Sequence, residues 1–326
     1  MRYLSLRTVG PALMLAIQFG GPSAAQVSIE PRLRPGRPPV ESGDVPHADL
    51  RVDASLVLIP VHVTTPLGTS VTSLSQENFR LFEDAVEQKI THFAKDDAPL
   101  SIGLLFDTSG SMRNKMRKSL EAAASFFRTS NPQDEFFLVE FNDRAKLSVP
   151  FTSDSDELYK QIQRTKPVGR TSLFDAVHLA LTQMKHARNS RKALVILSDG
   201  GDNCSRYNFK QIMNATLESD VLVYAIGIFD PEEQVRTPEE RNGPRLLDEL
   251  AEETGGKNYP VQNLDELPEI SARIGGELRN QYVLAYSPSN PARDGKYRRV
   301  TLNLVTPQDT PPLRTQYRQG YHAPIE

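Results

Sequence analysis

The sequence predicts an α/β fold, with a doubly wound and mostly parallel sheet and a small β-sandwich-like module built from flanking N- and C-terminal strands. From residue 100 onward, apolar strands alternate with amphipathic helices, a pattern typical of a parallel sheet covered on both faces. Strands without helices precede and follow this region. Each flanking group is too short to bury a core alone, so we expect the two groups to pack together.

The flanking segments are predicted to be strands because they are rich in β-branched residues or alternate between apolar and polar side chains. Turn residues separate them, such as the Pro66-Leu67-Gly68 segment. The predicted strands of the two flanks span residues 56–63, 78–84, 88–93, 281–286, 297–305 and 313–321.

The central region is predicted to be α/β because its strands are continuously apolar and its helices carry one apolar face. In the first helix Met116, Leu120, Ala124 and Phe127 recur at helical spacing. The predicted strands span residues 100–106, 136–141, 193–197 and 221–228. The predicted helices span residues 115–128, 157–165, 172–186, 209–218, 246–253 and 264–278.

The composition excludes several classes of protein. With 38 basic and 41 acidic residues among 326, the net charge is −3, which disfavours a nucleic-acid binder that neutralises phosphates. The single cysteine, Cys204, excludes a disulfide scaffold and a zinc site built from several thiolates. The hydrophobic fraction of 38% is enough for a sizeable core, so a wholly disordered chain is excluded as well.

The N-terminus indicates export. Arg2 and Arg7 give a positive start, and an apolar stretch follows at residues 9–19, too short to span a bilayer. The small residues Ser23 and Ala25 suit cleavage by signal peptidase. We therefore expect a secreted or periplasmic protein with no transmembrane segment in its mature chain. The predicted division is a signal peptide at 1–25, a Pro-rich linker at 26–49, the β module at 50–97 and 279–326, and the α/β domain at 98–278.

Oxygen-bearing side chains follow three segments of the predicted sheet. Asp107, Ser109 and Ser111 come directly after the first strand, Thr171 precedes a helix, and Asp199 follows the 193–197 strand. In doubly wound sheets, ligands bind at the carboxyl ends of strands where the strand order reverses, so we expect these loops to meet there. Two carboxylates and three hydroxyls are hard ligands that suit Mg²⁺ or Mn²⁺, with Ca²⁺ also possible.

The charge of this set suggests how it would be used. Two aspartates neutralise a divalent ion, and an aspartate that coordinates only through water leaves the ion electrophilic. The natural additional ligand is then a carboxylate from a partner protein that presents an Asp or Glu. The predicted function is therefore non-enzymatic and metal-dependent binding of a protein.

Together the three loops resemble the metal-ion-dependent adhesion site of the von Willebrand factor type A (vWA) family, over about residues 98 to 275. The resemblance implies a Rossmann-like vWA domain, direct or switchable ligation by Ser109, Ser111 and Thr171, and aspartates that often act through water. It also implies that the last helix, at residues 264–278, can move when a ligand binds. The flanks look like a bacterial group of exported vWA-related proteins, on the motifs Phe79-Arg80-Leu81-Phe82-Glu83-Asp84, Asn280-Gln281-Tyr282 and Gly320-Tyr321.

Other interpretations remain open at this stage. Asp107 is also a plausible strand-end or helix-capping residue, and Thr171 an ordinary helix cap. For Asp202 and Asn203 there are two interpretations, residues that support the metal ligands from behind and a solvated turn, of which the solvated turn is favoured. The first alternative function is a scaffold whose metal is structural or absent and whose β module binds the partner. The second is a hydrolase that uses Asp107, which is disfavoured because no second catalytic acid follows at position 109.

Overall fold

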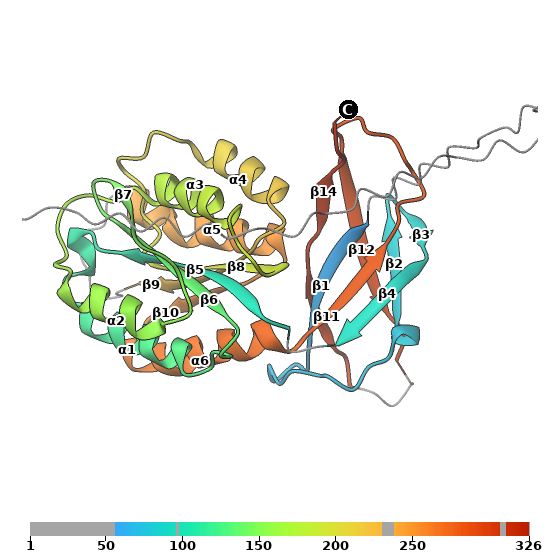
Figure 1. The fold of residues 1–326 in the computed structure, drawn as a ribbon, viewed down its shortest axis with the longest axis horizontal. Helices are drawn as coiled ribbons and strands as arrows, with labels where there is room; N and C mark the ends of the chain where they lie inside the picture. The colour runs from blue at the N-terminus through green and yellow to red at the C-terminus, as the bar shows by residue number, and fades with distance from the viewer. Residues whose placement is uncertain (1–55, 96–97, 230–237, 307–310, 326) are drawn as a thin grey trace, which may run out of the picture. The chain divides into compact units, whose positions relative to one another are not determined.

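The computed structural model describes residues 56–95, 98–229, 238–306 and 311–325 (Figure 1). The predicted signal peptide and the Pro-rich linker lie outside these residues. No described helix is both long enough and apolar enough to cross a membrane.

A six-stranded sheet forms the centre of the α/β region, in the order β10-β9-β8-β5-β6-β7. All neighbouring strands are parallel except β6 and β7, so the predicted doubly wound, mostly parallel sheet is confirmed. β5 pairs with both β6 and β8, which makes it the strand where the winding reverses. The strands are β5 (Leu100–Asp107), β6 (Glu135–Phe141), β7 (Ala145–Thr152), β8 (Arg191–Ser198), β9 (Leu222–Ile228) and β10 (Asn258–Val261).

Helices cover both faces of this sheet, with α1, α2 and α6 on one side and α3, α4 and α5 on the other (Figure 1). This explains why β5 is continuously apolar. Leu104 faces the layer of α1, α2 and α6, its neighbour Leu105 faces the layer of α3, α4 and α5, and both are fully buried. The helices are α1 (Met116–Phe127), α2 (Ser155–Arg164), α3 (Leu173–Met184), α4 (Phe209–Glu218), α5 (Pro238–Thr254) and α6 (Leu267–Arg279).

Three features of this region differ from the sequence-based expectation. The edge strands β7 and β10 were not predicted, since β7 has a single buried side chain, Val149, and β10 is only four residues long and contains Pro260. Helix α5 begins at Pro238, earlier than residue 246, because Pro244 lies inside the helix instead of ending it. The single strand expected at residues 313–321 is divided into β13 and β14.

Strands from both flanks mix in two four-stranded antiparallel sheets, which we call the β module. One sheet has the order β13-β1-β11-β4 and the other β14-β12-β2-β3. Each sheet therefore combines N- and C-terminal strands, as predicted. The strands are β1 (Val57–Thr64), β2 (Phe79–Glu83), β3 (Val86–Gln88), β4 (Ile90–Lys95), β11 (Gln281–Tyr286), β12 (Tyr297–Leu304), β13 (Arg314–Tyr317) and β14 (Gly320–His322).

A buried carboxylate joins the two sheets of the β module. Glu83 at the end of β2 is only 2% exposed. Its Oε2 accepts hydrogen bonds from the hydroxyl of Tyr286 at 2.8 Å and from the hydroxyl of Tyr321 at 2.7 Å. Tyr286 belongs to the first sheet and Tyr321 to the second. Two of the flanking motifs found in the sequence therefore meet at one polar contact inside the module.

Replacement of Glu83 by alanine is expected to lower the free energy of unfolding by about 2 kcal/mol, because it leaves two largely buried tyrosine hydroxyls without their acceptor. Chemical denaturation measures this change. The matched control is Glu87→Ala, which removes a carboxylate from an exposed ion pair with Arg80 and should cost less than about 1 kcal/mol. Equal losses in the two variants would contradict the role given to Glu83.

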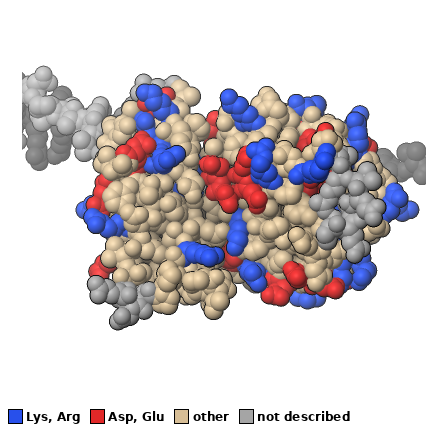
Figure 2. All heavy atoms as spheres, turned by 180° about the vertical axis from the view of Figure 1, so that it is seen from behind, with Lys and Arg blue, Asp and Glu red and all other residues tan. Residues whose placement is uncertain are grey.

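Charged side chains of both signs are interspersed on the surface. Figure 2 shows the face opposite to that of Figure 1, where a group of acidic side chains gathers near the middle and basic side chains are scattered around it. This mixture is what a net charge of −3 over 79 charged residues leads one to expect.

Candidate metal centre

The first loop of the candidate site begins where β5 ends. Asp107 is fully buried, and its Oδ1 accepts a hydrogen bond of 2.9 Å from the backbone N–H of Ser109. The hydroxyls of Ser109 and Ser111 share a hydrogen bond of 3.0 Å. The chain therefore turns tightly after the strand, and the carboxylate and two hydroxyls lie together, as predicted from the spacing.

Backbone hydrogen bonds fix the second loop against the first. The N–H of Gly110 donates to the carbonyl of Gly169 at 3.0 Å, and the N–H of Val168 donates to the carbonyl of Thr108 at 2.9 Å. Gly169 has a φ of +83°, which lets the chain turn two residues before Thr171. Thr171 is thereby placed next to the first loop and is 5% exposed.

The third loop is joined to both of the others. Ser198, the last residue of β8, donates from its hydroxyl to Asp107 Oδ2 at 2.6 Å. The N–H of Thr171 donates to Asn203 Oδ1 at 2.9 Å, and the N–H of Asn203 donates to the carbonyl of Thr171 at 3.1 Å. Asp199 follows Ser198 directly and is 5% exposed. The structure thus places all five predicted site residues in segments that contact one another at the carboxyl ends of the parallel strands.

Two neighbouring residues have roles that the sequence did not reveal. Asp202 and Asn203 are not a merely solvated turn, because Asn203 holds Thr171 and Asp202 Oδ2 accepts from the N–H of Phe174 at 2.9 Å, in the first turn of α3. The N-cap position of this helix is Ser172, whose side chain makes no capping bond. Asp202 therefore supplies the cap from a distant loop, and the capping role considered for Thr171 is not observed.

Burial and charge repulsion dominate the electrostatics of the centre. Burial, and secondarily the nearby Asp199 carboxylate, raise the pKa of Asp107 to about 7. Lys115 partly compensates for this repulsion, with its Nζ 3.7 Å from Asp199 Oδ2 and its side chain 4% exposed. Lys115 could not be identified as a site residue from the sequence, because its position directly before α1 gives no sign that its side chain turns toward the loops.

The residues present fit a hard divalent cation. Two buried carboxylates that repel each other are stabilised by a positive ion between them, and the adjacent hydroxyls offer neutral oxygen ligands. Within the described residues, no three His, Cys, Asp or Glu side chains are grouped so that they could hold a metal ion. A cation at these loops would therefore depend on hydroxyl and water oxygens for the rest of its coordination.

The family comparison agrees with this arrangement. Residues 102–201, from β5 to the loop after β8, match the family model of the von Willebrand factor type A domain. The chain contains a vWA domain. The resemblance inferred from the loop motifs is thereby confirmed, and the matched segment includes all five predicted site residues.

Known proteins resemble parts of the chain. A protein of Borreliella burgdorferi described as uncharacterized is 26% identical over 199 residues, 54% of this chain and 57% of that protein. The inter-alpha-trypsin inhibitor heavy chain H2 of Sus scrofa is 25% identical over 150 residues, 41% of this chain and 16% of the heavy chain. Among solved structures, a von Willebrand factor type A protein from Catenulispora acidiphila aligns with a TM-score of 0.49 at 13% identity, covering 73% of this chain and 74% of that one.

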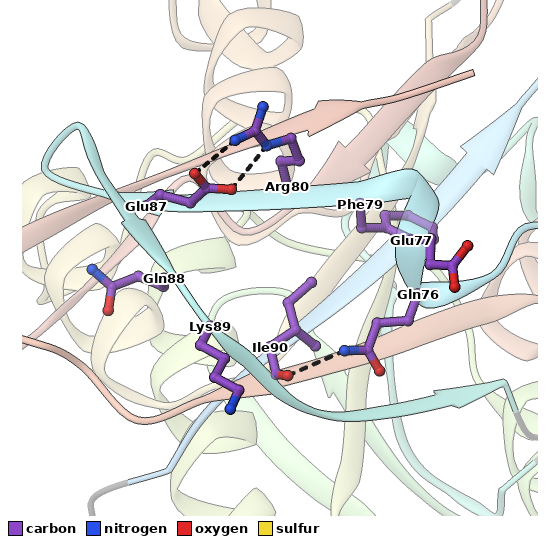
Figure 3. Close-up of a pocket in the computed structure, with 8 residues that line it drawn as sticks. All are labelled: Gln76, Glu77, Phe79, Arg80, Glu87, Gln88, Lys89 and Ile90. Atoms are coloured by element: carbon purple, nitrogen blue, oxygen red, sulfur yellow. Dashed lines mark hydrogen bonds and ion pairs between the residues drawn. The ribbon is translucent and has the colours of Figure 1, made fainter. Parts of the chain in front are cut away.

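The β module has a hollow of its own, separate from the vWA loops. It measures about 510 Å³ and contains none of the predicted site residues (Figure 3). Its charged groups are partly engaged with each other, since Arg80 Nε and Nη2 each donate to Glu87 at 2.8 Å. The lining residues are Gln76, Glu77, Phe79, Arg80, Glu87, Gln88, Lys89 and Ile90.

Proposed function

We propose that this protein is a divalent-metal-dependent protein-binding module, in which a carboxylate from a partner completes the coordination of a cation held by the vWA loops. One observation carries the proposal. Three loops that are distant in the sequence are hydrogen-bonded to one another around Asp107, and they bring two carboxylates and three hydroxyls to the strand end where the winding reverses. vWA domains generally mediate interactions and do not catalyse reactions, which supports a binding role.

Each site residue has a distinct part in this proposal. The hydroxyls of Ser109, Ser111 and Thr171 would contact the cation, and the carboxylates of Asp107 and Asp199 would supply negative charge, directly or through water. When bound, a cation such as Mg²⁺ or Mn²⁺ supplies a Lewis-acidic centre that attracts an anionic oxygen. The protein's own contribution is to hold the oxygens in place before the cation arrives, which the hydrogen bonds at Asp107 accomplish.

The surface beside Thr171 favours a protein partner. Val168 is 52% exposed, and the side chain of Arg170 is 67% exposed, although its Nε lies 3.4 Å from Asp143 Oδ1. An apolar side chain and a guanidinium next to the site can contact the residues that surround an incoming carboxylate. A rim of this kind contributes orientation and association rate more than affinity.

The compartment and the domain boundaries complete the proposal. We place the mature protein outside the cytoplasm, secreted or periplasmic, on the strength of the export signal at residues 1–25. The vWA domain is assigned to residues 98–278 and the β module to the segments on either side, since β11 begins directly after α6.

Capture of partners from an envelope or culture-supernatant extract tests the proposed function. With the full chain immobilised, we expect proteins retained in 1 mM Mg²⁺ to be released by a chelator and by excess free glutamate, because both remove the carboxylate–cation contact. Glutamine at the same concentration is the control and should release nothing. Retention that is unaffected by the chelator would contradict a metal-dependent interaction and would favour binding through the β module.

A further inference from the structure

A buried lysine is the unusual feature of this candidate metal centre. The Lys115 ammonium lies 3.7 Å from a carboxylate oxygen of Asp199, and both side chains are less than 10% exposed. A positive charge beside a proposed cation ligand opposes the binding of a cation. A site built only to hold metal as tightly as possible would not include it.

The backbone holds Lys115 firmly in this position. Its N–H donates to the carbonyl of Met112 at 2.9 Å, at the end of the turn that carries Ser111. Its own carbonyl accepts two hydrogen bonds from Ser119, one from the N–H at 2.9 Å and one from the hydroxyl at 3.0 Å. The lysine is therefore part of the same rigid turn as the first loop, and burial keeps its side chain close to Asp199.

The charge of Lys115 acts in opposite ways on a cation and on an anion. Its ammonium lies 3.7 Å from Asp199 Oδ2, so it opposes part of the attraction that this carboxylate exerts on a divalent cation. The same positive charge adds to the attraction that a bound cation exerts on an anion entering the site.

We propose that Lys115 determines specificity at this site: its ammonium weakens the binding of the divalent cation and strengthens the binding of a carboxylate to the cation-loaded site. This inference rests on the proposed function. It identifies the ligand class as anionic for a reason that lies in this chain's own residues. It also implies that Lys115 balances the Asp199 charge when no cation is bound, so that the loops keep their arrangement.

The two effects have opposite signs, which separates them from a structural role. If Lys115 only supported the fold of the loop, its removal would weaken the binding of cation and carboxylate alike. If it acts through its charge, its removal tightens the binding of the cation and weakens the binding of the carboxylate. Methionine is a suitable replacement because it retains an unbranched apolar side chain of similar length.

The test uses the full chain, treated with a chelator and then dialysed. Calorimetric titration with Mg²⁺ is expected to give an affinity about tenfold tighter for Lys115→Met than for the wild type. At saturating Mg²⁺, fluorescence anisotropy with a labelled nine-residue Gly/Ser peptide that carries one central glutamate should give an affinity about tenfold weaker. The same peptide with glutamine reports binding that does not depend on the carboxylate.

Two further variants serve as matched controls. Lys115→Arg keeps the charge, and both affinities should stay within about threefold of the wild type. Lys118→Met removes a lysine in the first turn of α1 that pairs instead with Asp265 and Glu121, and it should change neither affinity. Thermal unfolding of each metal-free variant verifies that it is folded, and Lys115→Gln replaces the methionine variant should that one not fold.

The possible results distinguish this inference from the proposed function. If the wild type binds Mg²⁺ and prefers the glutamate peptide, but Lys115→Met shows unchanged affinities or a loss of both, the inference is overturned and the proposed function stands. If the wild type does not bind Mg²⁺, or binds the glutamate and glutamine peptides equally in its presence, the proposed function itself is rejected. Tighter binding of Mg²⁺ together with weaker binding of the glutamate peptide by Lys115→Met supports both the inference and the proposed function.

Discussion

Replacement of Asp107 by asparagine is expected to weaken Mg²⁺ binding by at least about 100-fold, the largest functional effect of any single change in this protein. Asp107 is fully buried and supplies one of the two carboxylates in the proposed ligand set. Its neutral isostere removes that charge and leaves Asp199, 3.7 Å from the Lys115 ammonium, as the remaining carboxylate of the ligand set. The attraction for a divalent cation then nearly vanishes, because a hard cation gives up its hydration water chiefly to negatively charged oxygen ligands. Calorimetric titration of the chelator-treated chain measures the loss.

The asparagine variant is preferred to alanine because Asp107 also organises the loops. Its two oxygens accept from the N–H of Ser109 and the hydroxyl of Ser198, and an asparagine oxygen can still accept one of these bonds. Since burial and the proximity of Asp199 oppose ionisation of Asp107, loss of the charge should leave the metal-free protein at least as stable as the wild type. Asp143→Asn is the control, because its exposed carboxylate contacts Arg170 on the neighbouring loop without belonging to the proposed ligand set. Mg²⁺ binding by Asp107→Asn within threefold of the wild type would refute the metal centre.

The pattern of apolar residues predicted those strands and helices whose apolar side chains are completely buried. The continuous apolar run of β5 is buried on both faces, so its sequence has no interpretation other than a central strand. Strand β7 has no such run, because it lies at the edge of the sheet and Val149 is its one buried side chain. Helix α5 was predicted too short because a proline such as Pro244 usually ends a helix, whereas this helix continues through it and packs its apolar face on the sheet.

The candidate site was predictable for those residues that lie at the ends of buried strands. Asp107 and Asp199 come immediately after buried strands, so the parallel sheet alone brings them to one edge. The contacts made by Lys115, Asp202 and Asn203 were not predictable, since they involve segments between 28 and 84 residues away in the sequence. Residue spacing within one loop carries no information about such contacts.

Replacement of Tyr282 by alanine is expected to lower the free energy of unfolding by about 3 to 5 kcal/mol, the largest effect on stability that we predict. The tyrosine is fully buried between the two sheets of the β module. Its ring centroid lies 5.1 Å from that of Phe79 and 5.7 Å from that of Phe93. Removal of the ring leaves a cavity at a place where strands from both flanks meet, and the rigid backbones of two sheets cannot close it. Chemical denaturation measures the loss.

Tyr282→Phe separates the ring from the hydroxyl. The hydroxyl donates to the carbonyl of Val71 at 2.9 Å and accepts from the N–H of Leu74 at 3.0 Å, so it holds the segment between β1 and β2. Its loss should cost about 1 to 2 kcal/mol, well below the cost of the alanine variant. Equal losses would assign the stability to the hydroxyl and not to the packed ring. Because Tyr282 contributes no group to the vWA loops, the folded fraction of either variant should bind Mg²⁺ with the affinity of the wild type, whereas a parallel loss of Mg²⁺ affinity would mean that the β module supports the metal centre.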